Sequence, residues 1–236
     1  MVKTTLTTLD FWNSFPSDRL LIDASIWSAD ITCLKDELQR VDDWVDLYHF
    51  DVSDNHFVPG LLLYSDLVAG LRSLTHKPFH VHLMVENPLR LVDDFIQAGA
   101  NMITVHCDNG QEVTPVIKKI RDAGLTAGLG FGLEAKLEWI IPYLDQINLV
   151  LLMGTPMGVK GQGLSPLACL RVQQMKAIIG ESGFTKKILV EADGGIRQQT
   201  VPSLHAAGVD VVVPGSLIFK SDDLVDTFRW LHKLSR

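Results

Sequence analysis

Short apolar runs alternate with longer amphipathic stretches from about residue 20 to the end of this 236-residue chain. Such repeated β–α alternation predicts a parallel sheet with right-handed crossovers. Several amphipathic stretches end in glycine, where a helix C-cap is expected, as in QAGAN, DAGLT and AAGVD. The eight strand-like runs are 20–25, 45–51, 79–84, 101–106, 125–131, 147–153, 187–193 and 209–215.

Eight regular strand–helix units constrain the fold class more than any other feature of the chain. A compact (β/α)8 barrel has this number of units and this length. An open doubly wound sheet is the structural competitor, but it rarely needs eight regular units. Because no linker or low-complexity segment interrupts the pattern, we expect an α/β fold with a single domain. The predicted organisation is a short N-terminal extension at 1–19 and a catalytic (β/α)8 TIM barrel at 20–236.

Composition excludes several classes of partner. The chain is 47% hydrophobic, enough for a substantial core. Its net charge of −7, without a basic block, argues against nucleic acid, although backbone amides can still bind a small anion. Three widely spaced cysteines without a C-x-x-C motif are typical of reduced thiols, so we expect a cytoplasmic protein. Neither a signal-peptide core nor an apolar run of about 18 residues is present, and no membrane contact is expected.

Polar side chains gather at the ends of several predicted strands, where a barrel of this kind carries its chemistry. Side chains on a strand alternate between two faces, so His49 and Asp51 share one face, as do His80 and His82. A single His-x-Asp pair is more often a hydrogen-bonded core histidine with a capping aspartate. The polar residues at these strand ends are Ser25, Ser28, His49, Asp51, His80, His82, His106 and Asp193.

Three of these groups, Asp51, His82 and Asp193, each fall at the C-terminal end of a strand. Burying three ionisable groups at one place is costly unless a metal or a reaction uses them. With His49 they offer two imidazoles and two carboxylates, a mixed N/O set that suits Zn, Mn, Fe or Co better than Ca or Mg. We therefore expect one divalent metal ion at this end of the barrel.

Glycine-rich turns follow the last two predicted strands, at DGGI (193–196) and PGS (214–216). Barrels often bind phosphate there through backbone amides. Gly194, Gly195 and Gly215 allow the backbone to approach an anion closely, and Ser216 adds a hydroxyl. Neither turn matches a Walker loop or G-x-G-x-x-G, so nucleotide binding is unsupported.

Seven motifs carry a family resemblance over about residues 20 to 220: IDASIWSAD, HFDVSDNHFVP, VHLMVENP, AGANMITVH, LLM-x4-G-x-x-GQ, VEADGGI and PGSLIF. In this order they resemble the signatures of ribulose-phosphate 3-epimerases. The resemblance implies a (β/α)8 barrel, and one divalent metal held by His49, Asp51, His82 and Asp193. It implies that Asp51 and Asp193 are the catalytic acid and base on opposite faces of a sugar.

The implied reaction inverts C3 of a ketose phosphate, D-ribulose 5-phosphate / D-xylulose 5-phosphate or a related sugar, through an enediolate that the metal stabilises. Relatives commonly self-associate, so a homo-oligomer is expected. Lys160 would meet a phosphate or be a solvated loop charge, and His106 would line the pocket or be a core histidine. Core filling alone would explain Met84 and Met153, which the resemblance places beneath the substrate. The residues expected at the substrate and its phosphate are Ser25, Gly158, Gly161, Gln162, Gly194, Gly195, Gly215 and Ser216.

Departures from the family pattern surround the expected substrate. The family usually has Met and Gly at Ser53 and Asn55, Asp at His80, and Asn-Pro where Gly132 begins a Gly-Leu pair. The loop at 156–160 also differs, and Ala24 replaces a Pro. These changes leave the metal and acid–base set intact but remodel the loops that judge substrate shape.

Two functions remain open from the sequence. The first is an epimerase, acting on ribulose 5-phosphate or on another ketose phosphate. The second is a catalytically weakened paralogue that binds metal and phosphosugar as a binding or regulatory protein. A phosphate-binding lyase is disfavoured, because its D-x-K-x-x-D strand motif is absent.

Overall fold

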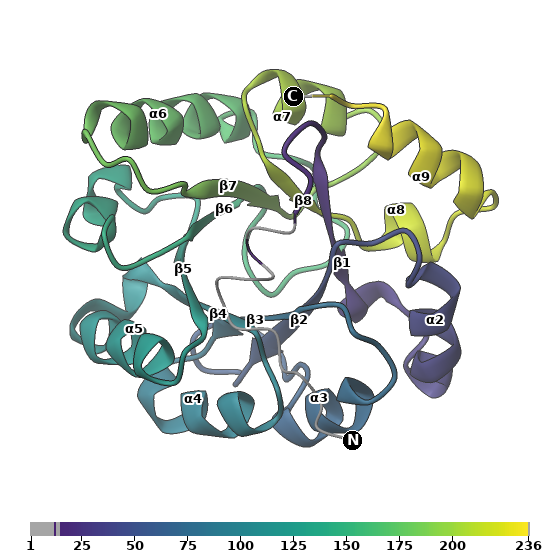
Figure 1. Ribbon diagram of the computed structural model, residues 1–236, viewed down its shortest axis with the longest axis horizontal. Helices are drawn as coiled ribbons and strands as arrows, with labels where there is room; N and C mark the ends of the chain where they lie inside the picture. Colours follow the sequence, from purple (N-terminus) through teal and green to yellow (C-terminus); the bar gives the residue numbers. More distant parts are fainter. Residues whose placement is uncertain (1–11, 13–14, 236) are drawn as a thin grey trace.

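The structure, a computed structural model, describes residue 12 and residues 15–235. Its eight strands pair in parallel, each with the next in sequence, and β8 closes onto β1 (Figure 1). This closed barrel confirms the predicted fold class. The strands are β1 (Leu21–Ser25), β2 (Leu47–Ser53), β3 (Phe79–Met84), β4 (Met102–His106), β5 (Thr126–Phe131), β6 (Leu149–Met153), β7 (Leu189–Asp193) and β8 (Val211–Val213).

Helices form a ring around the strands (Figure 1). In the helix at Val113–Asp122, Val113, Val116, Ile117 and Ile120 recur on one buried face, the spacing of an amphipathic helix. The β5–β6 connection is a 3₁₀ helix, η4 (Leu137–Tyr143), which contains Pro142. The α-helices are α2 (Leu34–Val41), α3 (Ser65–Arg72), α4 (Pro88–Gln97), α5 (Val113–Asp122), α6 (Ala168–Glu181), α7 (Val201–Ala206), α8 (Ser216–Phe219) and α9 (Leu224–His232), and the other 3₁₀ helices are η1 (Ile26–Ser28), η2 (Ile31–Cys33) and η3 (Cys107–Glu112).

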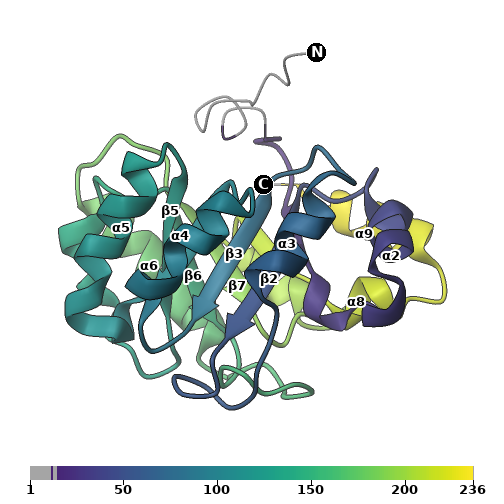
Figure 2. The same cartoon turned by 90° about the horizontal axis from the view of Figure 1, so that it is seen from below.

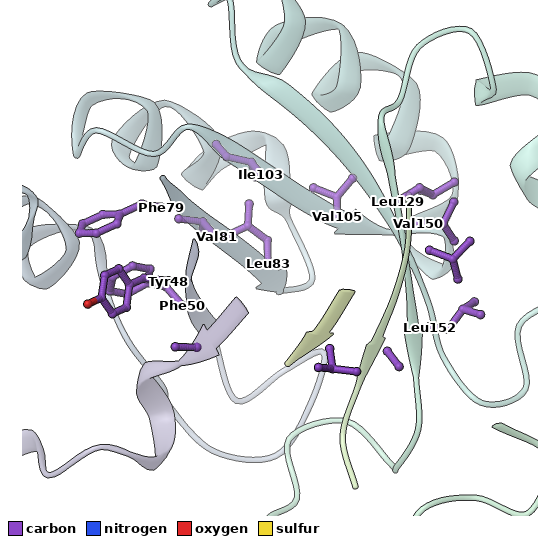
Figure 3. Packing of buried hydrophobic residues seen from close by; sticks show 14 of the residues in the cluster. Tyr48, Phe50, Phe79, Val81, Leu83, Ile103, Val105, Leu129, Val150 and Leu152 are labelled. Carbon is purple, nitrogen blue, oxygen red and sulfur yellow. The ribbon is translucent and has the colours of Figure 1, made fainter. Parts of the chain in front are cut away.

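The main hydrophobic core lies between the strands and the helices. Tyr48 and Phe50 of β2 pack beside Phe79 of β3 in this layer (Figure 3). Because side chains alternate along a strand, the intervening residues His49 and Asp51 face the barrel interior. The β2–β3 register pairs His49 with His80 and Asp51 with His82, so the polar residues of both strands lie at matching heights.

A second apolar cluster closes the N-terminal end of the barrel. Trp12 packs there against the first interior side chains of the strands, and its ring meets Phe15 edge-on at 5.7 Å. The strand arrowheads point away from this end (Figure 2). Of the predicted extension at 1–19, residues 1–11 and 13–14 lie outside the described residues. The cluster contains Trp12, Leu21, Leu47, Met102, Leu149, Leu189 and Val211.

Candidate active site and metal centre

Two groups of four ionisable side chains lie above this apolar floor inside the barrel. Each set of four offers two imidazoles and two carboxyl groups whose ligand atoms all lie within 4.8 Å of one another. They share His49, which lies between them. We call the group nearer the C-terminal ends of the strands the upper quartet and the other the lower quartet. The upper quartet is His49, Asp51, His82 and Asp193, and the lower quartet is Asp23, His49, His80 and Glu191.

The upper quartet brings together all four residues that the sequence predicts as metal ligands. His49 Nε2 lies 3.3 Å from His82 Nδ1, and each of these atoms lies 3.4 Å from Asp51 Oδ1. Asp193 Oδ2 lies 3.5 Å from His82 Nδ1 and 3.8 Å from His49 Nε2. Two ligands of a tetrahedral Zn²⁺ with bonds of about 2.0–2.1 Å are roughly 3.3 Å apart. The donor atoms therefore have both the chemistry and the spacing that a divalent metal requires.

Neighbouring side chains orient these donors. Ser25 Oγ donates to Asp51 Oδ2 at 2.9 Å, which leaves Oδ1 directed at the quartet. Burial favours the neutral form of Asp51, but the imidazoles of His49 and His82 outweigh it and hold the pKa of Asp51 well below its usual range. Asp51 is therefore a carboxylate, the form in which it acts as a ligand or a base.

His106 lies behind His82. The two Nε2 atoms are 2.7 Å apart, so one nitrogen donates and the other accepts. Burial lowers the pKa of His106 to about 4, which keeps its imidazole neutral. When His82 is the donor in this pair, its Nδ1 is the ring nitrogen left to bind a metal in the upper quartet. The side chain of His106 is completely buried and contacts His82 instead of facing the cavity.

A cavity with an empty volume of about 680 Å³ opens above the upper quartet. Asp51 and Asp193 reach it, while His49 and His82 are completely buried behind it. Each residue predicted to bind substrate lies on its wall, as do three of the four predicted pocket residues. These wall residues are Ser25, Met84, Met153, Gly158, Lys160, Gly161, Gln162, Gly194, Gly195, Gly215 and Ser216.

The predicted phosphate turns approach one another at one side of the cavity. Gly194 and Gly195 have φ values of +89° and +72°, and a Cβ on Gly195 would lie 2.9 Å from the Cα of Leu164. Only glycine fits this crossing of two backbones without strain. Close to it, a Cβ on Gly215 would lie 2.3 Å from Ser28 Oγ. The turns after β7 and β8 thus present bare backbone to the cavity.

Two cationic side chains, Lys160 and Arg197, lie on the same side of the cavity as the glycine turns. Lys160 Nζ donates to the Trp27 carbonyl at 2.6 Å and lies 4.7 Å from the centroid of the Trp27 ring, so the β6–α6 loop reaches across to β1. Burial lowers the pKa of Lys160. Arg197 lines the cavity and donates to the Gln162 carbonyl at 3.2 Å. Sequence reasoning did not single out Arg197, although it follows DGGI directly.

Ser53 and Asn55 do not line the cavity. Ser53 Oγ donates to the Gly60 carbonyl, and Asn55 Oδ1 accepts the Gly60 N–H, both at 2.8 Å. Asn55 has a φ of +59°, a left-handed conformation that asparagine tolerates well. These two departures from the family pattern close the loop after β2, so they act on its shape and not through direct contact with the cavity.

Sequence reasoning singled out only two members of the lower quartet, His49 and His80. Asp23 and Glu191 escaped notice, although each stands two residues before a predicted site residue, Ser25 or Asp193, and so shares its face. Asp23 Oδ2 lies 2.6 Å from His80 Nδ1 and 3.1 Å from His49 Nδ1. Burial raises the pKa of Glu191 well above its usual range, and the neighbouring Asp23 adds to the effect.

The fold and this cavity define an enzyme of the barrel class, with its chemistry at the carboxyl ends of the strands. A family model described as "Ribulose-phosphate 3 epimerase family" matches residues 21–219. The ribulose-phosphate 3-epimerase of Escherichia coli strain K12 is 36% identical over 205 residues, 86% of this chain and 90% of that protein. The Chlamydia pneumoniae protein of the same name is 31% identical over 208 residues, 88% of this chain and 91% of its own length.

Solved structures agree at the level of the fold. The 3-hexulose-6-phosphate synthase of Salmonella typhimurium has a TM-score of 0.64 at 18% identity, covering 91% of this chain and 98% of that one. The tryptophan synthase A-subunit of Pyrococcus furiosus has a TM-score of 0.63 at 15% identity, covering 91% and 95%. At such low identity, these matches support the barrel alone.

The chain therefore belongs to the ribulose-phosphate 3-epimerase family. It is an isomerase, a carbohydrate-phosphate 3-epimerase of pentose phosphate metabolism. The family depends on a divalent metal and acts on a sugar phosphate. No helix within the described part of the chain is long and apolar enough to cross a membrane.

Proposed function

We propose that the protein inverts C3 of a ketose phosphate, D-ribulose 5-phosphate / D-xylulose 5-phosphate or a close analogue, with Asp51 and Asp193 as the acid–base pair. One observation carries the proposal. These two carboxylates converge with His49 and His82 at metal-ligand spacing, and both also reach the cavity. The upper quartet would hold one divalent ion, Zn, Fe, Mn or Co, whose identity elemental analysis of the purified protein would establish.

The reaction needs two proton-transfer groups. When bound, the metal supplies Lewis-acid stabilisation of the negative charge that develops on the substrate oxygens. One aspartate takes the C3 proton and the other returns a proton to the opposite face, which inverts the centre. The direction of the reaction decides which aspartate is the base. Ser25 keeps the Asp51 carboxylate oriented during this exchange through the hydrogen bond to Oδ2.

The phosphate of the substrate would lie against the turns after β7 and β8. Backbone amides near Gly194, Gly195 and Gly215 would bind it together with Ser216, because bare backbone there faces the cavity. Lys160 and Arg197 add positive charge on the same wall. Lys160 would exchange its bond to the Trp27 carbonyl for one to the phosphate. Lys160→Met should then raise KM about tenfold, with a smaller change in kcat, in a steady-state assay.

Solvent deuterium exchange tests the chemistry directly. Metal-loaded protein is incubated with D-ribulose 5-phosphate in D₂O, and label at C3 is followed by NMR. We expect exchange in the wild type and its loss in both Asp51→Asn and Asp193→Asn. Asp66→Asn, which changes an exposed carboxylate on α3, serves as the matched control and should exchange normally.

Two results would contradict the proposal. The first is retained conversion between the two C3 epimers in either aspartate variant. The second is an absence of exchange across a panel of tetrulose, pentulose and hexulose phosphates with one equivalent of metal bound. If the panel still binds without exchange, the chain is a phosphosugar-binding protein of the same family. Light scattering on the same sample would test the expected homo-oligomer.

A further inference from the structure

The lower quartet holds one side of the metal ligand His49. His49 directs Nε2 at the upper quartet, and its other ring nitrogen, Nδ1, lies 3.1 Å from Asp23 Oδ2. Both side chains are completely buried, so no water competes for this contact. A neutral imidazole that donates Nδ1–H to a carboxylate presents a lone pair at Nε2, the form that binds a metal.

Asp23 is itself held from the opposite side. His80 Nδ1 lies 2.6 Å from the same oxygen, Asp23 Oδ2, and His80 Nε2 lies 2.7 Å from Thr104 Oγ1. Gly128 on the next strand makes room for Thr104, because a Cβ there would come within 2.1 Å of Oγ1. One row of interior contacts therefore runs from β1 through β3 and β4 to β5, and it fixes the carboxylate beneath His49.

A second metal does not explain this arrangement. Two ligands of one tetrahedral ion lie roughly 3.3 Å apart, whereas 2.6 Å between Asp23 and His80 is a hydrogen bond. The other nearby contact, 3.6 Å from His80 Nδ1 to Glu191 Oε2, is too long for a good hydrogen bond. The lower quartet is a hydrogen-bonded support that contains one well-held carboxylate.

We propose that Asp23 is the positioning residue for the metal ligand His49, and that His80 holds it in place. The family pattern usually has an aspartate where His80 stands, on β3. In this chain Asp23 of β1 supplies the carboxylate that contacts His49, and an imidazole occupies the family position on β3. The inference rests on the proposed metal at the upper quartet and adds a positioning residue to that site.

Metal affinity tests this role apart from turnover. Asp23→Asn keeps the size of the side chain and removes its charge. We expect it to bind Zn²⁺ and Co²⁺ roughly 10- to 100-fold more weakly, in competition with a chelating dye, because outer-shell partners of a ligand histidine contribute that much. The visible spectrum of bound Co²⁺ should also change, which a loss of packing alone would not cause.

Two further variants control the experiment. Glu191→Gln alters the same buried layer at a residue that makes no hydrogen bond to His49, and its metal affinity should stay within about threefold of the wild type. The double change Asp23→Ala with His80→Asp moves the carboxylate to β3, on the strand position opposite His49. It should recover most of the lost affinity, and circular dichroism of each apoprotein confirms that the variants are folded.

The outcomes separate the two proposals. If the wild type binds no metal, the proposed function and this inference both fail. If it binds one equivalent and Asp23→Asn binds equally well, only the role of Asp23 is overturned. A second equivalent in the wild type that Asp23→Asn removes would also overturn it, as would a folded double variant whose affinity stays low.

Discussion

The upper and lower quartets contain the same kinds of side chain and share His49, yet their geometry differs. In the upper quartet the two imidazole donor atoms lie 3.3 Å apart and 3.4–3.8 Å from the carboxylate oxygens, too far for strong mutual hydrogen bonds. In the lower quartet, Asp23 lies within 2.6 Å of one imidazole and 3.1 Å of the other. The contrast teaches that the spacing of the donor atoms, and not the type of residue, separates a candidate metal centre from a buried polar support.

The two quartets also differ in their access to the cavity. Asp51 and Asp193 face the cavity, whereas each member of the lower quartet is completely buried between the upper quartet and the apolar floor around Trp12. Sealed from water, the lower quartet leaves Asp23 Oδ1 and both Glu191 oxygens without a hydrogen-bond partner among the described residues. The carboxylates that we propose as reactive groups therefore occupy the open layer, and the unpaired polar atoms of the closed layer are an energetic cost of supporting them.

The strongest test of the comparison removes a ligand from the upper quartet alone. His82→Ala should abolish metal binding and lower kcat/KM on the order of 10³-fold, because the Lewis acid is lost. Elemental analysis and a coupled epimerase assay measure the two effects. His80→Gln, on the same strand and face, is the matched control and should cost only about tenfold. Equal losses in the two variants would erase the distinction between the quartets.

Truncating a side chain of the apolar cluster beneath the lower quartet should reduce the stability of the fold. Trp12 is 8% exposed, so Trp12→Ala should reduce the free energy of unfolding by about 3 kcal/mol. Urea denaturation of the metal-loaded protein measures the loss. We expect kcat/KM of the surviving folded protein to change little, since the cavity lies at the other end of the barrel. A large loss of activity at unchanged stability would show that the two ends are coupled.

Adding a methyl group to the row of interior contacts that holds Asp23 should reduce stability by a smaller amount. Gly128→Ala places a methyl against Thr104 Oγ1 and should destabilise the fold by about 2 kcal/mol. Adding Thr104→Ala removes the clashing oxygen, so the double variant should be more stable than the sum of the two single changes predicts. Strict additivity of the unfolding free energies would mean that the two sites do not meet.

Replacing the buried carboxyl group of Glu191 should have the smallest effect and the opposite sign. Glu191→Met replaces a buried carboxyl with an apolar side chain of similar length. We expect the free energy of unfolding to rise by about 1 kcal/mol, with metal affinity unchanged. Calorimetry of apoprotein and metal-loaded protein checks both values. A destabilised variant with weaker metal binding would place Glu191 in the support of His49.

Much of this architecture could be predicted because it depends on local periodicity. Eight alternating units define the barrel, and period two places His49 with Asp51 and His80 with His82 on the interior face. The contacts between strands could not be predicted in the same way. Asp23 pairs in register with Leu47, yet its carboxylate reaches His49 two residues further along β2, because the strands are staggered.

The contacts made by loop residues could not be predicted from local periodicity either. Ser53 and Asn55 stand inside the most recognisable motif, and the sequence predicted that they remodel a loop near the substrate without indicating which contacts they make. In the structure both side chains bond to Gly60, seven and five residues further on, and the contact depends on a left-handed turn at Asn55. Arg197 reaches the cavity only because the turn after β7 folds toward the β6–α6 loop. Long-range folding of loops carries no periodic signal in sequence.

The sealed position of the lower quartet also affects how fast its protons exchange with solvent. Strands surround it, Trp12 and its neighbours close it below, and the upper quartet closes it above. Protons on the His80 and His49 rings can then exchange with solvent only when the barrel opens transiently. With metal bound, these protons should persist long enough to give separate, far-downfield NMR signals. Their exchange rates would report how often the closed end of this barrel opens transiently.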